Sequence, residues 1–111
     1  MSDSILLTIR EFCTGQKEDD YFDNILILHA NSVFSILNHL GIGPKKPFSI
    51  SDDSSEWEDF TNEKTYLESV KSYVCLKVRL LFDPPASSTI LDSYTRQISE
   101  IEWRLFEVED E

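Results

Sequence analysis

Apolar residues recur at helical spacing over two stretches in the first half of the chain. From about Asp3 to Thr14 they return every three or four residues after the N-cap candidates Ser2 and Asp3, and Gly15 provides a stop. The acidic residues 18–20 lead into a second helix that ends before Gly41, because carboxylates favour the positive end of a helix dipole. Its apolar residues cover more than one narrow stripe, so we expect this helix to be contacted from two sides and to be central: Phe22, Ile25, Leu26, Val33, Phe34, Ile36, Leu37 and Leu40.

A third helical pattern follows in the second half. Ser55 and Glu58 suit a capping box for a helical turn that contains Trp57 and Phe60. Asn62 is a candidate cap for a longer helix, which Asp83 and the two prolines after it stop near Phe82. Its predicted core stripe is Leu67, Val70, Val74, Val78 and Leu81, flanked by Tyr66, Tyr73 and Leu80.

The last predicted helix starts near Ser87 or Ser88 and carries a heptad-like seam: Leu91, Tyr94, Ile98, Ile101, Leu105 and Val108. Trp103 lies almost opposite this seam, and Phe106 lies more than about 100° from its centre. These two aromatic residues are neighbours on one helical surface beside Arg104. Such a pair is typical of a protein-interface anchor, which we favour; the alternative is that a second helix of the same bundle covers it.

Together these patterns predict an all-α fold, a small helical bundle of about four helices with a long loop between the second and third. We expect residues 1–111 to form a single domain that ends in an acidic C-terminal tail over 106–111. The loop at 42–55 is longer than most connections between packed helices, and Phe48 and Ile50 interrupt its polar sequence. We therefore interpret it as a partner-contacting loop, with Phe48 and Ile50 as candidate interface residues.

The charge of the chain excludes some partners. Twenty-one acidic and ten basic residues give a net charge of −11, which repels nucleic acid and anionic membranes, although it also suits a surface whose only role is solubility. No run approaches the ~18 apolar residues that a membrane span requires. Cys13 and Cys75 fit no metal or redox spacing and are interpreted as small buried apolar residues in a reducing compartment.

No constellation in the sequence predicts a catalytic residue, a cofactor site or a metal site. His29 and His39 lie about 80° and nearly three turns apart on one predicted helix, which excludes an i, i+4 metal pair. The segment 41–46 follows a helix and lacks the spacing of a phosphate-binding loop. Lys77 lies on an apolar face, where its stem snorkels across the surface or its ammonium pairs with a carboxylate of another helix or subunit.

One part of the sequence resembles a known family. The run from Ser69 to Pro85, then Ser87-Ser88 and the segment Glu100 to Leu105, is similar to small virion proteins of tailed phages, the head-to-tail connector or adaptor subunits. The upstream segment Ile25 to Gly43 fits the same group, so the resemblance covers about Tyr21 to Leu105.

This resemblance implies a helical bundle repeated in a ring, commonly of twelve subunits, in the neck of the virion. The implied partners are copies of the chain, the portal protein and a stopper or tail-completion protein, and DNA passes through the channel without specific binding. The protein would be made in the cytoplasm of the host bacterium and would contact no membrane. The alternative is an acidic helical binding module, for instance an inhibitor of a basic protein whose carboxylates imitate DNA phosphates.

Overall fold

The computed structural model describes the backbone of residues 4–61 and 64–110 and the side chains of 4–61 and 67–105. It contains α1 (Ile5–Thr14), α2 (Asp23–His39), the short α3 (Trp57–Phe60), α4 (Lys64–Phe82) and α5 (Ser88–Asp110). Within the described residues there is no strand, only one isolated bridge between Ser4 and Glu56. The predicted all-α bundle, with a long loop between the second and third helical segments, is confirmed.

Local hydrogen bonds shift two predicted helix starts. Ser4 caps α1, its hydroxyl accepting from the Leu7 N–H at 3.3 Å, whereas the predicted caps Ser2 and Asp3 lie outside the described residues. The capping box of α3 joins Glu56 and Asp59, one position later than predicted. The Ser55 carbonyl accepts from the Ile5 N–H at 3.0 Å, so this residue pairs with the start of α1. The Asn62 cap predicted for α4 lies outside the described residues.

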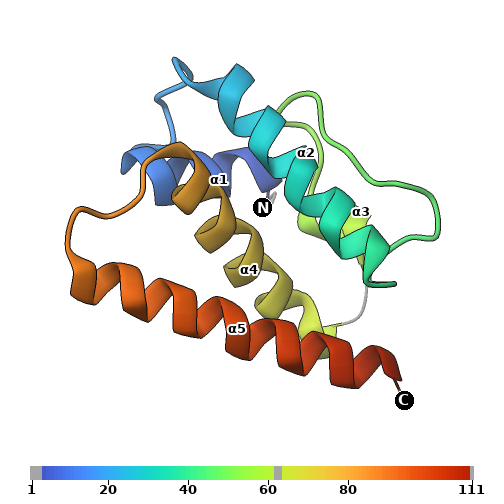
Figure 1. The fold of residues 1–111 in the computed structure, drawn as a ribbon. Helices are drawn as coiled ribbons and strands as arrows, with labels where there is room; N and C mark the ends of the chain where they lie inside the picture. The colour runs from blue at the N-terminus through green and yellow to red at the C-terminus, as the bar shows by residue number, and fades with distance from the viewer. Residues whose placement is uncertain (1–3, 62–63, 111) are drawn as a thin grey trace.

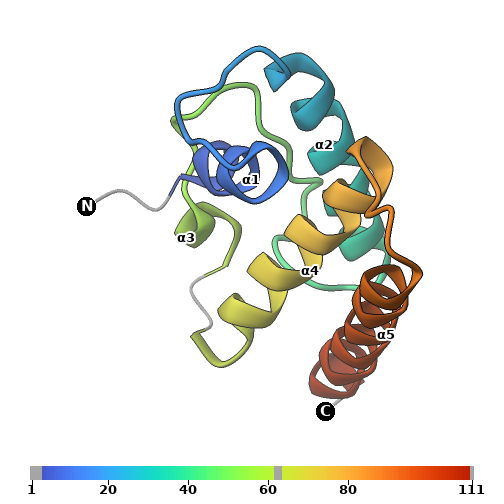
Figure 2. The same cartoon turned by 90° about the vertical axis from the view of Figure 1, so that its left-hand side faces the viewer.

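The central helix is α4, not α2 as the sequence predicted. It packs against α1, α2 and α5, whereas α2 packs against α4 and α1. Figures 1 and 2 show α4 running between the other helices, with α1 and α3 on one side and α5 on the other. The physical reason is that α4 buries residues on several sides, including Val70, Tyr73, Val74 and Val78. The apolar surface of α2 is wider than its contacts, and part of it therefore stays exposed.

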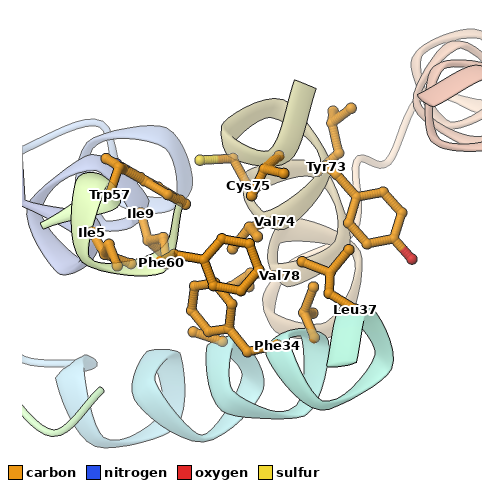
Figure 3. Packing of buried hydrophobic residues seen from close by; sticks show 14 of the residues in the cluster. Ile5, Ile9, Phe34, Leu37, Trp57, Phe60, Tyr73, Val74, Cys75 and Val78 are labelled. Atoms are coloured by element: carbon orange, nitrogen blue, oxygen red, sulfur yellow. The ribbon is translucent and has the colours of Figure 1, made fainter. Parts of the chain in front are cut away.

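The core gathers aromatic rings of α2 and α3 against the valines of α4 (Figure 3). Trp57 is fully buried, and its indole N–H donates to the Thr8 hydroxyl of α1 at 3.1 Å. Phe34 of α2 stacks against Phe60 of α3 with 5.1 Å between ring centres. The short α3, at the end of the long loop, therefore holds that loop against both α1 and α2.

One predicted core residue lies outside this core. Leu81 is 53 % exposed, because the last turn of α4 extends to the edge of the bundle. There its neighbour Phe82 packs edge-on against Phe22, with 5.0 Å between ring centres.

A charged pair joins α1 to the start of α2. Arg10 is buried and donates from Nε to one Asp23 carboxylate oxygen at 2.8 Å and from Nη2 to the other at 2.5 Å. Its Nη1 also donates to the Lys17 carbonyl at 3.0 Å. The hydrogen bonds to Asp23, opposed by burial, raise the pKa of Arg10 above its ordinary value. This side chain fixes both ends of the turn between α1 and α2.

The predicted seam of α5 is buried, and the structure shows that α5 packs on α4. Ile98, Ile101 and Leu105 are buried, and Leu91 and Tyr94 are half-buried. The side chains of Val108 and of the predicted acidic tail lie outside the described residues, but the backbone of 106–110 continues α5.

Candidate interaction surface

The two candidate loop residues serve the fold of their own chain. Ile50 is only 4 % exposed, and its backbone N–H and carbonyl both bond to the Asn31 side chain, at 2.7 and 3.0 Å. The Phe48 ring lies 4.9 Å from that of Phe34 and 5.2 Å from that of Phe60, measured between centres. Both apolar side chains thus fold back onto the core, and they no longer argue for an intermolecular contact. A partner-contacting role for the loop stays a prediction, and it would depend on other residues of the loop.

The outer side of that loop is polar. Asn38 at the end of α2 donates to the Pro44 carbonyl at 3.4 Å, which holds the start of the loop beside the last turn of the helix. Lys45 and Lys46 follow and are exposed. Further along, Asp52 and Asp53 are exposed, so the loop offers basic residues near α2 and acidic residues near α3.

Trp103 lies on the outside of the molecule, in agreement with its position opposite the seam, and is 66 % exposed. Together with Ile36, Leu40 and Glu102 it lines a cavity of about 470 Å³ between α2 and α5. The side chain of Phe106 lies outside the described residues, so the predicted aromatic pair is described only at Trp103. Of the candidate interface residues, Trp103 is the one that lines an open apolar cavity.

Sequence reasoning missed an exposed apolar stripe on α2. Ile25 is 39 %, Leu28 is 60 % and Ile36 is 42 % exposed, and their spacing of three and eight residues places them along one side of the helix. The sequence did contain an indication of this stripe, because α2 has more apolar positions than its contacts with α4 and α1 can cover. We call Ile25, Leu28, Ile36, Leu40 and Trp103 the α2–α5 face.

Glu102, which lines the cavity, also belongs to a polar network with α4. The Tyr73 hydroxyl of α4 donates to the Glu102 carboxylate of α5 at 2.8 Å, and burial together with this bond raises the pKa of Tyr73. The Lys77 ammonium lies 5.7 Å from the centre of the Tyr73 ring. The ammonium thus lies over the ring of the residue one turn before it, and the choice between the two arrangements predicted from the sequence stays a prediction.

The cysteines lie in the core as free thiols, as predicted. Burial raises the pKa of Cys13 to about 11 and that of Cys75 to about 12, so both are protonated and unreactive near neutral pH. In the part of the chain that the structure describes, no group of three or more His, Cys, Asp or Glu side chains is placed to hold a metal ion. None of the helices, searched over the described residues, is long and apolar enough to cross a bilayer.

Comparison with known proteins gives one match. The family model described as phage connector protein matches residues 5–111. No curated protein and no solved structure matches the chain. The match extends over α1 to α5, and therefore includes both helices of the α2–α5 face.

Proposed function

Because the chain belongs to the phage connector protein family, we propose that copies of it form a ring in the neck of a tailed phage particle. The ring joins the portal protein to the stopper or tail-completion protein and continues the DNA channel. The chain is made in the cytoplasm of the host bacterium and acts only within the assembled particle. A connector is a structural component, so the proposal includes no catalytic step.

The α2–α5 face is the observation that supports assembly. A monomer gains nothing from placing Leu28 and Trp103 in water at 60 % and 66 % exposure, whereas burying them in an interface gains about 25 cal/mol per Å² of apolar surface. Aromatic and aliphatic residues that surround a cavity are typical of the centre of an interface. In this proposal, another component of the phage neck covers them, which is consistent with membership of the connector family.

The charge of the chain suits a channel for DNA. With a net charge of −11, the surface has few basic side chains whose contact with phosphates would release counterions from the DNA. DNA therefore slides past without adsorbing. The alternative function, an acidic inhibitor of a basic protein, draws on the same charge but leaves the α2–α5 face without a role. We therefore favour the connector.

The test is assembly of the purified chain, alone and with the purified portal protein of the same phage. Native mass spectrometry and negative-stain images should show rings, or rings docked on the portal. A matched pair of aspartate variants tests whether the α2–α5 face is responsible. Leu28→Asp changes a residue of the face and should abolish rings. Ile90→Asp changes a side chain of α5 that is 47 % exposed and not part of the face, and it should leave the rings intact.

Two results would contradict the proposal. A chain that stays monomeric with saturating portal protein is not a connector ring. A monomer that instead binds a basic DNA-binding protein tightly supports the inhibitor. Rings that form normally with Leu28→Asp, folded by circular dichroism, would show that assembly does not depend on the α2–α5 face.

A further inference from the structure

The turn between α1 and α2 presents an aromatic side chain to solvent. Tyr21 is 83 % exposed, more than any other large apolar or aromatic side chain that the structure describes. Its ring stands edge-on against Phe22, with 4.9 Å between centres, and Phe22 stands edge-on against Phe82 at 5.0 Å. The ring is thus supported from behind and points away from its own core.

Several bonds hold this turn in place before any partner binds. Arg10 bonds to the Lys17 carbonyl on one side of Tyr21 and to Asp23 on the other. The Asp19 carboxylate accepts from the Tyr21 N–H at 3.2 Å. A side chain that is fixed in advance loses little conformational entropy on binding, which is the property of an interface anchor.

The opposite end of α2 carries a cavity suited to an aromatic ring. Ile36, Leu40 and Trp103 supply its apolar walls, and Glu102 supplies a carboxylate. This carboxylate already accepts from Tyr73 and retains further lone pairs, so it can also accept from a phenol. We call these four residues the socket.

The charges around the two features are complementary. Exposed Glu18 and Asp20 precede Tyr21, whereas exposed Lys45 and Lys46 follow the end of α2 at which the socket lies. Because α2 has 17 residues and is about 25 Å long, Tyr21 cannot reach the socket of its own chain. A contact between different patches of two identical chains is heterologous, and repeating it builds a ring when the rotation closes.

On the premise of the proposed connector function, we infer that Tyr21 of one subunit inserts into the socket of the next subunit and forms the contact that repeats around the ring. The Tyr21 ring packs against Trp103, and its hydroxyl donates to Glu102. The acidic turn then faces Lys45 and Lys46 of the neighbouring copy. This contact gives the long loop its role in assembly through its lysines, while Phe48 and Ile50 hold it in place.

Photo-crosslinking tests the contact directly. The variant Tyr21→benzoylphenylalanine keeps an aromatic ring at the position, and it is assembled with an equal amount of nitrogen-15-labelled chain. We expect crosslinks to peptides that contain Ile36, Leu40 or Trp103, each with the mass of a mixed-isotope pair. Crosslinks only within one copy, or to other surfaces, would overturn the inference.

Substitutions measure how much the contact contributes. Tyr21→Ala should raise the concentration at half-assembly by about 30-fold or more, the effect of an anchor worth about 2 kcal/mol. Tyr21→Phe, which loses only the hydroxyl, should raise it less. The control Ile90→Ala removes a side chain that is 47 % exposed and belongs to neither feature; it lies 13 residues before Trp103 on α5, about 20 Å along the helix, and it should leave assembly unchanged.

A charge exchange separates a direct contact from a general effect of charge. Glu18→Lys with Asp20→Lys should weaken assembly, and Lys45→Glu with Lys46→Glu should weaken it too. Because each interface contains both patches, the chain that carries all four changes should recover assembly. Continued loss in that chain would contradict the pairing.

The outcomes distinguish this inference from the proposed function. Rings that form normally with Tyr21→Ala, and that show no crosslink to the socket, overturn the contact but leave the connector ring intact. A wild-type chain that forms no ring even with the portal protein overturns both.

Discussion

The two tryptophans of the chain should respond in opposite ways to truncation. Trp57 is fully buried and bonds to Thr8, whereas Trp103 is 66 % exposed. Trp57→Ala leaves a cavity, which costs about 3–5 kcal/mol in protein cores. The lost hydrogen bond adds little, because the Thr8 hydroxyl also donates to the Ser4 carbonyl at 2.7 Å. Trp103→Ala removes no core packing and should change the free energy of unfolding by only about 0.5 kcal/mol.

A loss of about 4 kcal/mol is large for a domain of this size, whose total stability is of the order of 5–15 kcal/mol. It should lower the melting temperature by roughly 15 °C or more. Urea unfolding followed by far-ultraviolet circular dichroism measures both variants without relying on the tryptophan that was removed. The protein concentration is kept below that of assembly, so the free energy refers to the monomer.

Fluorescence of the remaining tryptophan provides a control in each variant. Trp103→Ala retains the buried Trp57, which should emit at shorter wavelength and be shielded from iodide. Trp57→Ala retains the exposed Trp103, which should be quenched. A stability loss of 3 kcal/mol or more for Trp103→Ala, in the core range, would refute the exposure argument and show that the ring is covered within the monomer.

Two further predictions concern backbone conformation and pH. Gly15 and Gly43 both have positive φ, 84° and 94°, but a Cβ at Gly43 would overlap the Phe60 ring whereas one at Gly15 meets open space. Gly15→Ala should cost about 1–2 kcal/mol and Gly43→Ala distinctly more; equal costs in urea unfolding would contradict the overlap. Because burial raises the pKa of Cys13 and Cys75 from 9.0, the unfolded chain loses these protons first and the free energy of unfolding should fall as pH rises above about 9. Cys13→Ala with Cys75→Ala should flatten this fall between pH 8 and 10.5, and an unchanged slope would refute the assignment.

Helical periodicity by itself determined most of the secondary structure. The spacing of Ile98, Ile101 and Leu105 predicted the buried seam of α5, and Asp83 with its two prolines predicted the end of α4. These features are local, because helix faces and helix stops depend on residues within a few positions of each other. The same locality explains why Trp103 could be placed opposite the seam from the sequence alone, whereas its exposure of 66 % is known only from the structure.

The path of the long loop was decided only by the tertiary structure. An apolar residue in a polar segment indicates burial but not which surface buries it, so Phe48 and Ile50 were equally consistent with a partner. Their place in the core depends on Asn31, 19 residues from Ile50 in the sequence, and on the rings of Phe34 and Phe60. Helical periodicity cannot predict contacts between residues so far apart in the sequence.

The candidate site likewise required the arrangement of helices. The sequence showed that α2 has a wide apolar surface but not that α4 is central, and therefore not which part of α2 stays exposed. The socket combines Ile36 and Leu40 with Glu102 and Trp103, which are more than 60 positions further along the chain. Helix patterns are set by neighbours within a few residues, whereas a cavity between helices depends on how α2 and α5 pack against α4, and only the tertiary structure determines that packing.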